Sequence, residues 1–214
     1  MKAVRQGCLG IITLIILLVG VVIVYWNFGW PWNYIEEKKA LHAAAEEKYG
    51  KEFTMKKMVF DVMHGSEYYG YATDEDGVLF YVGFEDGKFD DSYLHERWDY
   101  ELKKEIEPII RPFFTDADSV IVSVGSVENK KDTGSSIPDY KESVTVELGA
   151  NMSEVTVQDV EAELDRVWQA VEAIQEAGAR VSAIHIGYEN KVLNYRNELT
   201  TREELNGFLV DYAR

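Results

Sequence analysis

The spacing of hydrophobic and polar positions divides this chain into distinct stretches, and the first stretch is apolar throughout. From Cys8 to Trp26 there are nineteen residues without a charge, and thirteen of them are Leu, Ile or Val. At about 1.5 Å per residue, a helix of this length spans close to the roughly 30 Å hydrocarbon core of a membrane. A cleaved signal peptide has a shorter apolar run, of about 7 to 15 residues. The pattern predicts an uncleaved transmembrane helix over residues 8–26.

Aromatic residues gather where this apolar run ends. They are Tyr25, Trp26, Phe28, Trp30, Trp32 and Tyr34. Indole and phenol rings favour the headgroup depth of a bilayer, so this cluster is typical of an interfacial belt. Lys2 and Arg5 precede the run, whereas the mixed charges of residues 36–39 follow it. The positive-inside rule therefore predicts a cytoplasmic tail over residues 1–7 and an extracytoplasmic C-terminal region.

The single cysteine, Cys8, lies at the start of the apolar run. A lipid-anchored lipoprotein needs its cysteine after such a run, so Cys8 is interpreted as a small apolar residue at the inner boundary rather than as a lipidation site. The region after the anchor contains no cysteine. This composition excludes disulfides, thiol nucleophiles and cysteine-ligated metals from that region.

After the aromatic cluster, the apolar positions take up helical spacing and then strand spacing. Asn33 followed by Glu36 has the form of a helix cap, and Gly50 ends the helical pattern. Three apolar segments, separated by turn signals, follow at residues 53–62, 67–73 and 78–84. The third segment is apolar on both faces, which predicts a central strand.

A second amphipathic helix starts near Asp91 or Ser92 and is ended or kinked by Pro108 and Pro112. Its apolar stripe contains Leu94, Trp98, Leu102, Ile106 and Ile109. The pattern predicts an αβββα unit over residues 33–114.

The rest of the chain predicts a second unit over residues 115–214. Alternating strand patterns around Val122 and Val146 flank a long polar loop at 128–140, and Asp159 opens a helix that Gly178 ends. Two strands are predicted at 180–188 and 191–196. A last helix is predicted from a cap at Thr201 with Glu204, and its apolar residues are Leu205, Phe208, Leu209 and Tyr212. This unit is ββαββα, so the fold class is α+β, a transmembrane helix followed by two small antiparallel-sheet-plus-helix units.

The charge distribution excludes one class of partner. The chain contains 22 basic and 38 acidic residues, and only two of the bases and none of the acids precede Tyr34. The region from Tyr34 onward therefore has a net charge of −18. Such a surface repels nucleic acid and anionic lipid headgroups. We expect no nucleic-acid partner, and lipid contact only through residues 8–26.

The histidines do not form a metal-binding pattern. The four of them, at 42, 64, 95 and 185, lie in four different segments and never at the i, i+4 spacing of a helical metal site. His185 lies between Ile184 and Ile186 in a predicted strand, so its side chain is expected on the opposite face from theirs. It is the histidine that we consider for a function, although a surface position without one is the more frequent case.

Two acidic turns, at residues 74–77 and 85–91, suggest calcium because clustered oxygen ligands suit that ion. Neither turn matches the EF-hand loop, and Asp and Gly are what a hairpin turn needs. No serine lies in a G-x-S-x-G sequence, and no two of the 38 acids stand out as a catalytic pair. The sequence therefore predicts no catalytic, cofactor-binding or metal-binding residue, and no cofactor.

Three segments support a family resemblance: Glu47-Lys48-Tyr49-Gly50, the Tyr-rich meander from Tyr68 to Phe84, and Ser92-Tyr93-Leu94-His95-Glu96-Arg97-Trp98. Over roughly residues 33–114 the chain resembles the small membrane-anchored or lipid-anchored proteins of Gram-positive bacteria known as YfjL-like, which have no assigned activity. Its element order is also similar to that of PepSY-like modules, which implies restraint of proteases or binding of peptides. No functional residue of either family matches a position here, and a transmembrane helix replaces the lipobox.

These observations predict a non-enzymatic, membrane-tethered extracytoplasmic protein that binds another protein or an envelope component. Two alternatives stay open. One is an envelope hydrolase with a site between the two units, which predicts a polar pocket. The other is a structural subunit of a larger membrane complex.

Overall fold

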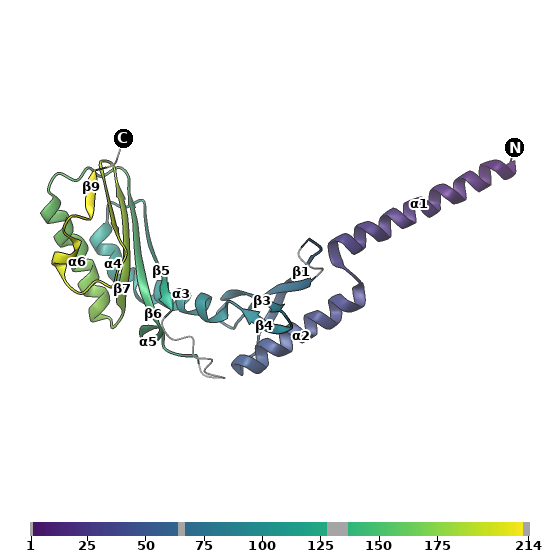
Figure 1. The fold of residues 1–214 in the computed structure, drawn as a ribbon, viewed down its shortest axis with the longest axis horizontal. Helices are drawn as coiled ribbons and strands as arrows, with labels where there is room; N and C mark the ends of the chain where they lie inside the picture. The colour runs from purple at the N-terminus through teal and green to yellow at the C-terminus, as the bar shows by residue number, and fades with distance from the viewer. Residues whose placement is uncertain (1, 64–66, 128–136, 212–214) are drawn as a thin grey trace. The chain divides into compact units, whose positions relative to one another are not determined.

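A computed structural model describes residues 2–63, 67–127 and 137–211, and the side chains from Thr13 onward (Figure 1). It is a mixed α+β structure with an apolar N-terminal helix and two sheets that contain antiparallel pairs, which confirms the predicted class at that level. The chain divides into two compact units, Met1–Tyr93 and Leu94–Arg214.

The first unit begins with two helices, α1 (Lys2–Phe28) and α2 (Pro31–Tyr49). The segment Thr13–Tyr49 contains a helical window that is long and apolar enough to cross a membrane, with a mean hydropathy of 2.0. Its aliphatic side chains are exposed, as Ile16 at 65% and Val22 at 59% show. Gly29, with φ of +62°, breaks the helix, and Pro31 starts the next one.

Tyr68 joins the end of α1 to the first sheet. Its hydroxyl donates a hydrogen bond to the carbonyl of Phe28 at 3.0 Å and lies 3.4 Å from the carbonyl of Trp30. A side chain at position 29 would bring its Cβ to 2.0 Å from this hydroxyl, so glycine is required there by space as well as by backbone angle. The ring of Tyr25 packs edge-on against that of Phe60, with centroids 5.8 Å apart.

The first sheet has the strand order β1-β2-β3-β4, and all its neighbouring strands are antiparallel. Its strands are β1 (Thr54–Asp61), β2 (Glu67–Thr73), β3 (Leu79–Glu85) and β4 (Lys88–Asp91). The third strand is central, as predicted. Helix α2 covers one face of the sheet with its buried residues Leu41, Ala45 and Tyr49.

Strand β4 was not predicted, because its residues were interpreted as an acidic turn before a helix. The preceding turn explains the difference. Asp86 and Gly87 both adopt positive φ, of 51° and 73°, which is the backbone of a two-residue hairpin. Lys88 then pairs with Glu85, and Phe89 with Phe84.

The second unit starts with short helices and then forms a five-stranded sheet with the order β5-β6-β7-β8-β9. Its helices are α3 (Tyr93–Glu105), α4 (Glu107–Ile110), η1 (Arg111–Phe114), α5 (Tyr140–Ser143), α6 (Val160–Glu176) and η2 (Arg202–Leu205). Its strands are β5 (Ser119–Val127), β6 (Val144–Met152), β7 (Arg180–Tyr188), β8 (Lys191–Tyr195) and β9 (Leu209–Asp211).

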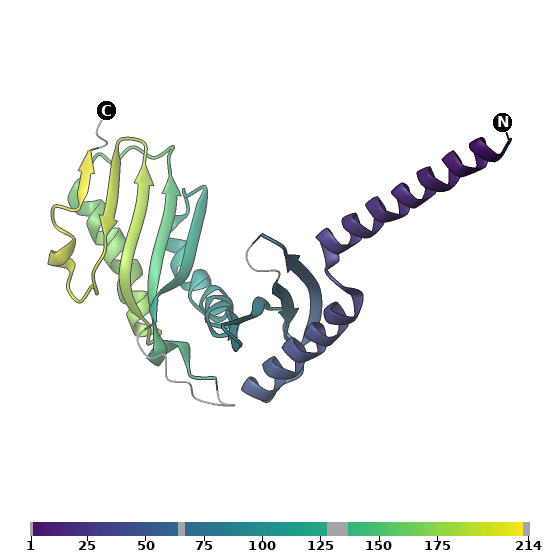
Figure 2. The same ribbon diagram turned by 45° about the vertical axis from the view of Figure 1, so that its right-hand side comes forward.

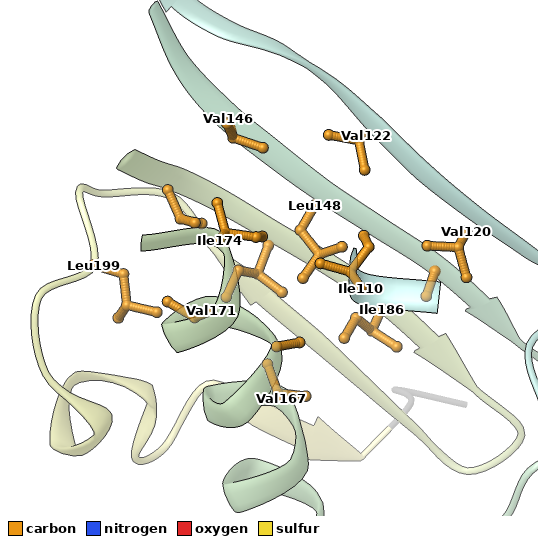
Figure 3. Packing of buried hydrophobic residues seen from close by; sticks show 14 of the residues in the cluster. Ile110, Val120, Val122, Val146, Leu148, Val167, Val171, Ile174, Ile186 and Leu199 are labelled. Carbon is orange, nitrogen blue, oxygen red and sulfur yellow. The ribbon is translucent and has the colours of Figure 1, made fainter. Parts of the chain in front are cut away.

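Only the pair β6 and β7 is parallel in this sheet, because the crossover helix α6 connects these two strands. Figure 2 shows α6 lying along one face of the sheet. The core lies between them (Figure 3): Leu148 and Ile186 from the strands meet Val171 and Ile174 from the helix, all at most 1% exposed.

The boundary between the units lies between Tyr93 and Leu94, whereas the sequence pattern predicts it near residue 115. Packing explains the difference. Trp98, Leu102 and Ile106 belong to the same buried cluster as the second sheet. The Trp98 indole also donates a hydrogen bond to the carbonyl of Pro138 at 3.0 Å. The apolar stripe of α3 therefore serves the second core.

The predicted last helix was wrong. Residues 202–205 form only the short η2, and Leu209–Asp211 is a strand paired with β8. Gly207 adopts φ of +83°, which ends any helix at that point. Tyr212, placed on the predicted helix, and residues 128–136 of the predicted loop lie outside the described residues.

Candidate functional site

The structure does not bring the described histidines together. His42 lies on α2, where its Nε2 is 2.8 Å from the carbonyl of Phe53. His95 is exposed on α3, His185 is exposed on β7, and His64 lies outside the described residues. Over residues 13–63, 67–127 and 137–211, no three His, Cys, Asp or Glu side chains are grouped to hold a metal ion.

Each of the two acidic turns uses one aspartate structurally. Asp74, which is 7% exposed, accepts hydrogen bonds from the backbone of Asp76 and Val78 and from the hydroxyl of Tyr93, at 2.9 to 3.0 Å. Asp91 accepts bonds from Lys48, the hydroxyl of Tyr49 and the backbone of Tyr93. These carboxylates close turns and fasten α2 to the first sheet.

His185 does lie on the face that the sequence predicts. Ile184 and Ile186 are fully buried under α6, and the imidazole is exposed on the other face of the sheet. Its neighbours across the strands are Gly149 on β6 and Asn194 on β8. Because Gly149 has no side chain, one flank of the imidazole is open.

A concavity of about 550 Å³ lies on this open face of the second sheet. Polar side chains dominate its lining, and they come from four adjacent strands or from the turn after β8. They are Ser126, Glu147, Ser182, His185, Asn194, Arg196 and Asn197; Tyr195 also borders the concavity, but its side chain is buried in the core on the other face. We call this surface the polar concavity.

Three hydroxyls form the floor at one end of the polar concavity. The Thr145 hydroxyl, in a residue only 1% exposed, lies 2.6 Å from that of Ser182 and 3.0 Å from that of Ser126. The Ser126 backbone N–H also donates to Thr145 Oγ1. Irregularities in the pairing, near Gly125 on β5 and between Val146 and Glu147 on β6, bring these strands into that arrangement.

Gly125 makes room for these hydroxyls. A Cβ at this position would lie 2.7 Å from Ser182 Oγ and 2.9 Å from Thr145 Oγ1. The three hydroxyls bond one another across the strands. A nucleophilic serine instead bonds to a base that activates it. The geometry of these three hydroxyls therefore matches a hydrogen-bonded floor of the concavity. It does not match a nucleophilic serine bonded to its base.

Tyr195 follows Asn194 on β8, and its side chain is buried in the core on the other face of the sheet. The Tyr195 hydroxyl donates to Glu204 Oε2 at 2.7 Å, and burial together with this bond raises the pKa of Tyr195 to about 12. The hydroxyls of Thr200 and Thr201 also bond to Glu204. These contacts lower the pKa of Glu204 to about 2, and the bond from Thr200 contributes most, followed by the bond from Tyr195. These contacts fasten η2 to β8 on the side of the sheet that α6 covers.

Alternation along the sequence places one member of this surface, His185, and the other members were not predicted. Glu147 lies between Val146 and Leu148 as His185 lies between two isoleucines, so the same alternation rule would have placed it on this face. The serines gave no such signal, because the pairing irregularities that bring them together are tertiary features.

No protein-family model, no curated protein and no solved structure matches this chain.

Proposed function

We propose that this chain is a single-pass membrane protein whose N-terminus is cytoplasmic and whose C-terminal region binds a polar component of the cell envelope. The exposed apolar side chains of α1 support the anchor, since leaving them in water is unfavourable. The basic residues before the anchor and the acidic region after it support the orientation. We include in this proposal a relationship to YfjL-like proteins, which rests on the sequence segments alone.

The polar concavity is the observation that carries this proposal. It gathers hydroxyls, amides, an imidazole, a carboxylate and a guanidinium on one uncovered sheet face. Such a set donates and accepts hydrogen bonds in several directions, as recognition of a polar ligand requires. A sheet face that only contacts solvent does not require a floor of bonded hydroxyls. It also does not require a glycine, here Gly125, that leaves room for them.

A tether also makes weak recognition sufficient. A site of modest affinity is occupied when anchor and ligand share the same membrane surface, because their effective concentration is high. We therefore expect weak binding by the soluble region and stronger retention by the anchored chain.

Protease treatment of intact cells tests the topology. With a C-terminal tag, we expect digestion of the tagged region from outside and a mature mass that includes the first thirty residues. Protection of the tag, or loss of those residues, contradicts the proposed anchor and moves the search for function elsewhere.

Site-specific photo-crosslinking tests the binding surface. A crosslinking residue replaces Asn194 in the polar concavity, and a matched control replaces Glu172, which is exposed on α6. We expect adducts with envelope glycan or protein from position 194 that fall when His185→Ala and Glu147→Gln are added. Equal adducts from both positions contradict a specific surface.

A second candidate function is envelope hydrolysis, which one observation favours: Glu147 and His185 line the same concavity. A carboxylate and an imidazole can serve as general base and acid. In that case Glu147→Gln abolishes turnover of an envelope polymer and retains binding. A pure binding module shows no turnover in either form.

A further inference from the structure

The first sheet has an uncovered face of a different kind, built from three tyrosines. Tyr69, Tyr71 and Tyr81 are half-buried, and they alternate along β2 and β3 with buried residues that face α2. Tyr71 is paired directly with Tyr81, and Tyr69 with Gly83. We call this set the tyrosine face.

The three rings contact one another. The centroid of Tyr81 is 5.8 Å from that of Tyr69 and 6.5 Å from that of Tyr71, and Tyr69 and Tyr71 are 6.3 Å apart. Gly83 leaves room for the Tyr81 side chain, because a Cβ at position 83 would lie 2.1 Å from the Tyr81 hydroxyl. The result is a continuous aromatic surface over two central strands.

Carboxylates surround one end of this surface. Asp90 pairs with Gly83, while Glu67 and Glu85 follow the same alternation on β2 and β3. A concavity of about 280 Å³ at this end is lined by Asp61, Glu67, Tyr69 and Tyr81, among others. Burial, followed by the charges of Asp90, Glu67 and Glu85, raises the pKa of the Tyr81 hydroxyl.

These carboxylates are available to a ligand. The ion pairs found among the described residues do not include Glu67, Glu85 or Asp90. Lys57 and Lys88 lie on the same face, on the outer strands β1 and β4, and Lys56, the extra residue at the pairing irregularity of β1, is exposed beside Lys57. The face carries four acids, Asp61, Glu67, Glu85 and Asp90, against these lysines, so negative charge is in excess beside the rings.

We propose that the tyrosine face binds a basic, extended segment of a partner protein, with Lys or Arg side chains over the rings and their charges against Glu67, Glu85 and Asp90. Aromatic faces attract ammonium and guanidinium groups, and carboxylates at the rim add to that attraction. Anionic lipid is repelled by the same carboxylates, and a neutral glycan gains little from them. This inference is independent of the polar concavity, which lies on the other unit.

The test uses the full chain in nanodiscs of zwitterionic lipid and three fluorescent probes: a short Arg/Ser peptide, its Glu/Ser counterpart and a neutral oligosaccharide. We expect the Arg/Ser peptide alone to bind, with an affinity that falls as salt is raised. Binding of the oligosaccharide without the peptide overturns the proposal in favour of a glycan site.

Two pairs of substitutions separate the aromatic and ionic contributions. Removing two rings in Tyr69→Thr with Tyr71→Thr is expected to weaken peptide binding by about fivefold to thirtyfold, and threonine keeps the strand preference. Glu67→Gln with Asp90→Asn is expected to weaken binding and to flatten its salt dependence.

Leu79→Thr is the matched control, because Leu79 is 53% exposed on the same face but outside the cluster. It should leave binding unchanged, as should His185→Ala in the other unit. Circular dichroism melting of each variant reports whether the fold is intact. Unchanged peptide affinity in both folded double variants contradicts the proposed surface.

Discussion

The uncovered faces of the two sheets differ in what holds their side chains in place. On the first sheet the tyrosine face consists of rings packed on one another, and Gly83 is crowded only by the end of a side chain. On the second sheet the hydroxyls of the polar concavity are fixed by hydrogen bonds between strands. The first surface can adapt to a ligand, whereas the second is preorganised, so substitutions should affect them differently.

The largest expected effect comes from the core that supports the polar concavity. Leu148→Ala removes a side chain that is 1% exposed from the second core and should lower the free energy of unfolding by about 2 to 5 kcal/mol. Hydrogen exchange should show the loss over β6, β7 and α6. Because the residues of this core all come from the second unit, β2 and β3 should keep their protection. Equal loss in both sheets would show that the two units unfold together.

Gly125→Ala should disturb the preorganised surface directly. The added Cβ meets Ser182 Oγ and Thr145 Oγ1 at under 3.0 Å, and overpacking of this kind costs about 1 to 3 kcal/mol. Gly149→Ala is the control, since its nearest atom is 3.7 Å away on the same face. Urea denaturation of both variants checks the difference. A loss for Gly149→Ala as large as for Gly125→Ala argues against the hydroxyl floor.

Gly83→Ala should act on the adaptable surface in the opposite way. The Tyr81 hydroxyl is the end of a movable side chain, so we expect a change in unfolding free energy within about 0.5 kcal/mol. Displacement of the ring should still weaken binding of the Arg/Ser peptide. A stability loss matching that of Gly125→Ala would mean that the tyrosine face is as rigid as the polar concavity.

The smallest effect is a pH dependence at the contact between Tyr195 and Glu204, on the core side of the second sheet. The pKa of Glu204 is lowered from 4.5 to about 2, so its contribution is fully present above pH 4.5 and is lost as the pH falls towards 2. Glu204→Gln should therefore flatten the acid limb of the stability curve for the second unit. An unchanged acid limb would show that the hydroxyls of Tyr195 and Thr200 do not stabilise this carboxylate.

Sequence pattern predicts most of the elements, since periodicity places both helices that cover the sheets and the central position of β3. Sequence pattern fails where positive backbone φ angles determine the structure. The turn at Asp86-Gly87 creates β4, and Gly207 ends the expected helix before the strand β9. Sequence pattern also assigns α3 to the wrong core, because an apolar stripe does not reveal what it packs against. For the binding surfaces, alternation places His185 but not the hydroxyls that strand irregularities bring together.

The bond between Tyr68 and the end of α1 couples the rotation of that helix to the first sheet. Its acceptors are the carbonyls of Phe28 and Trp30, so α1 cannot turn about its own axis without either breaking the contact or turning the sheet. One residue inserted into α1 turns everything before it by about 100° relative to the sheet. The number of residues in α1 thus sets the direction in which the tyrosine face points relative to the start of that helix, and a twist applied to α1 acts on that face as torque.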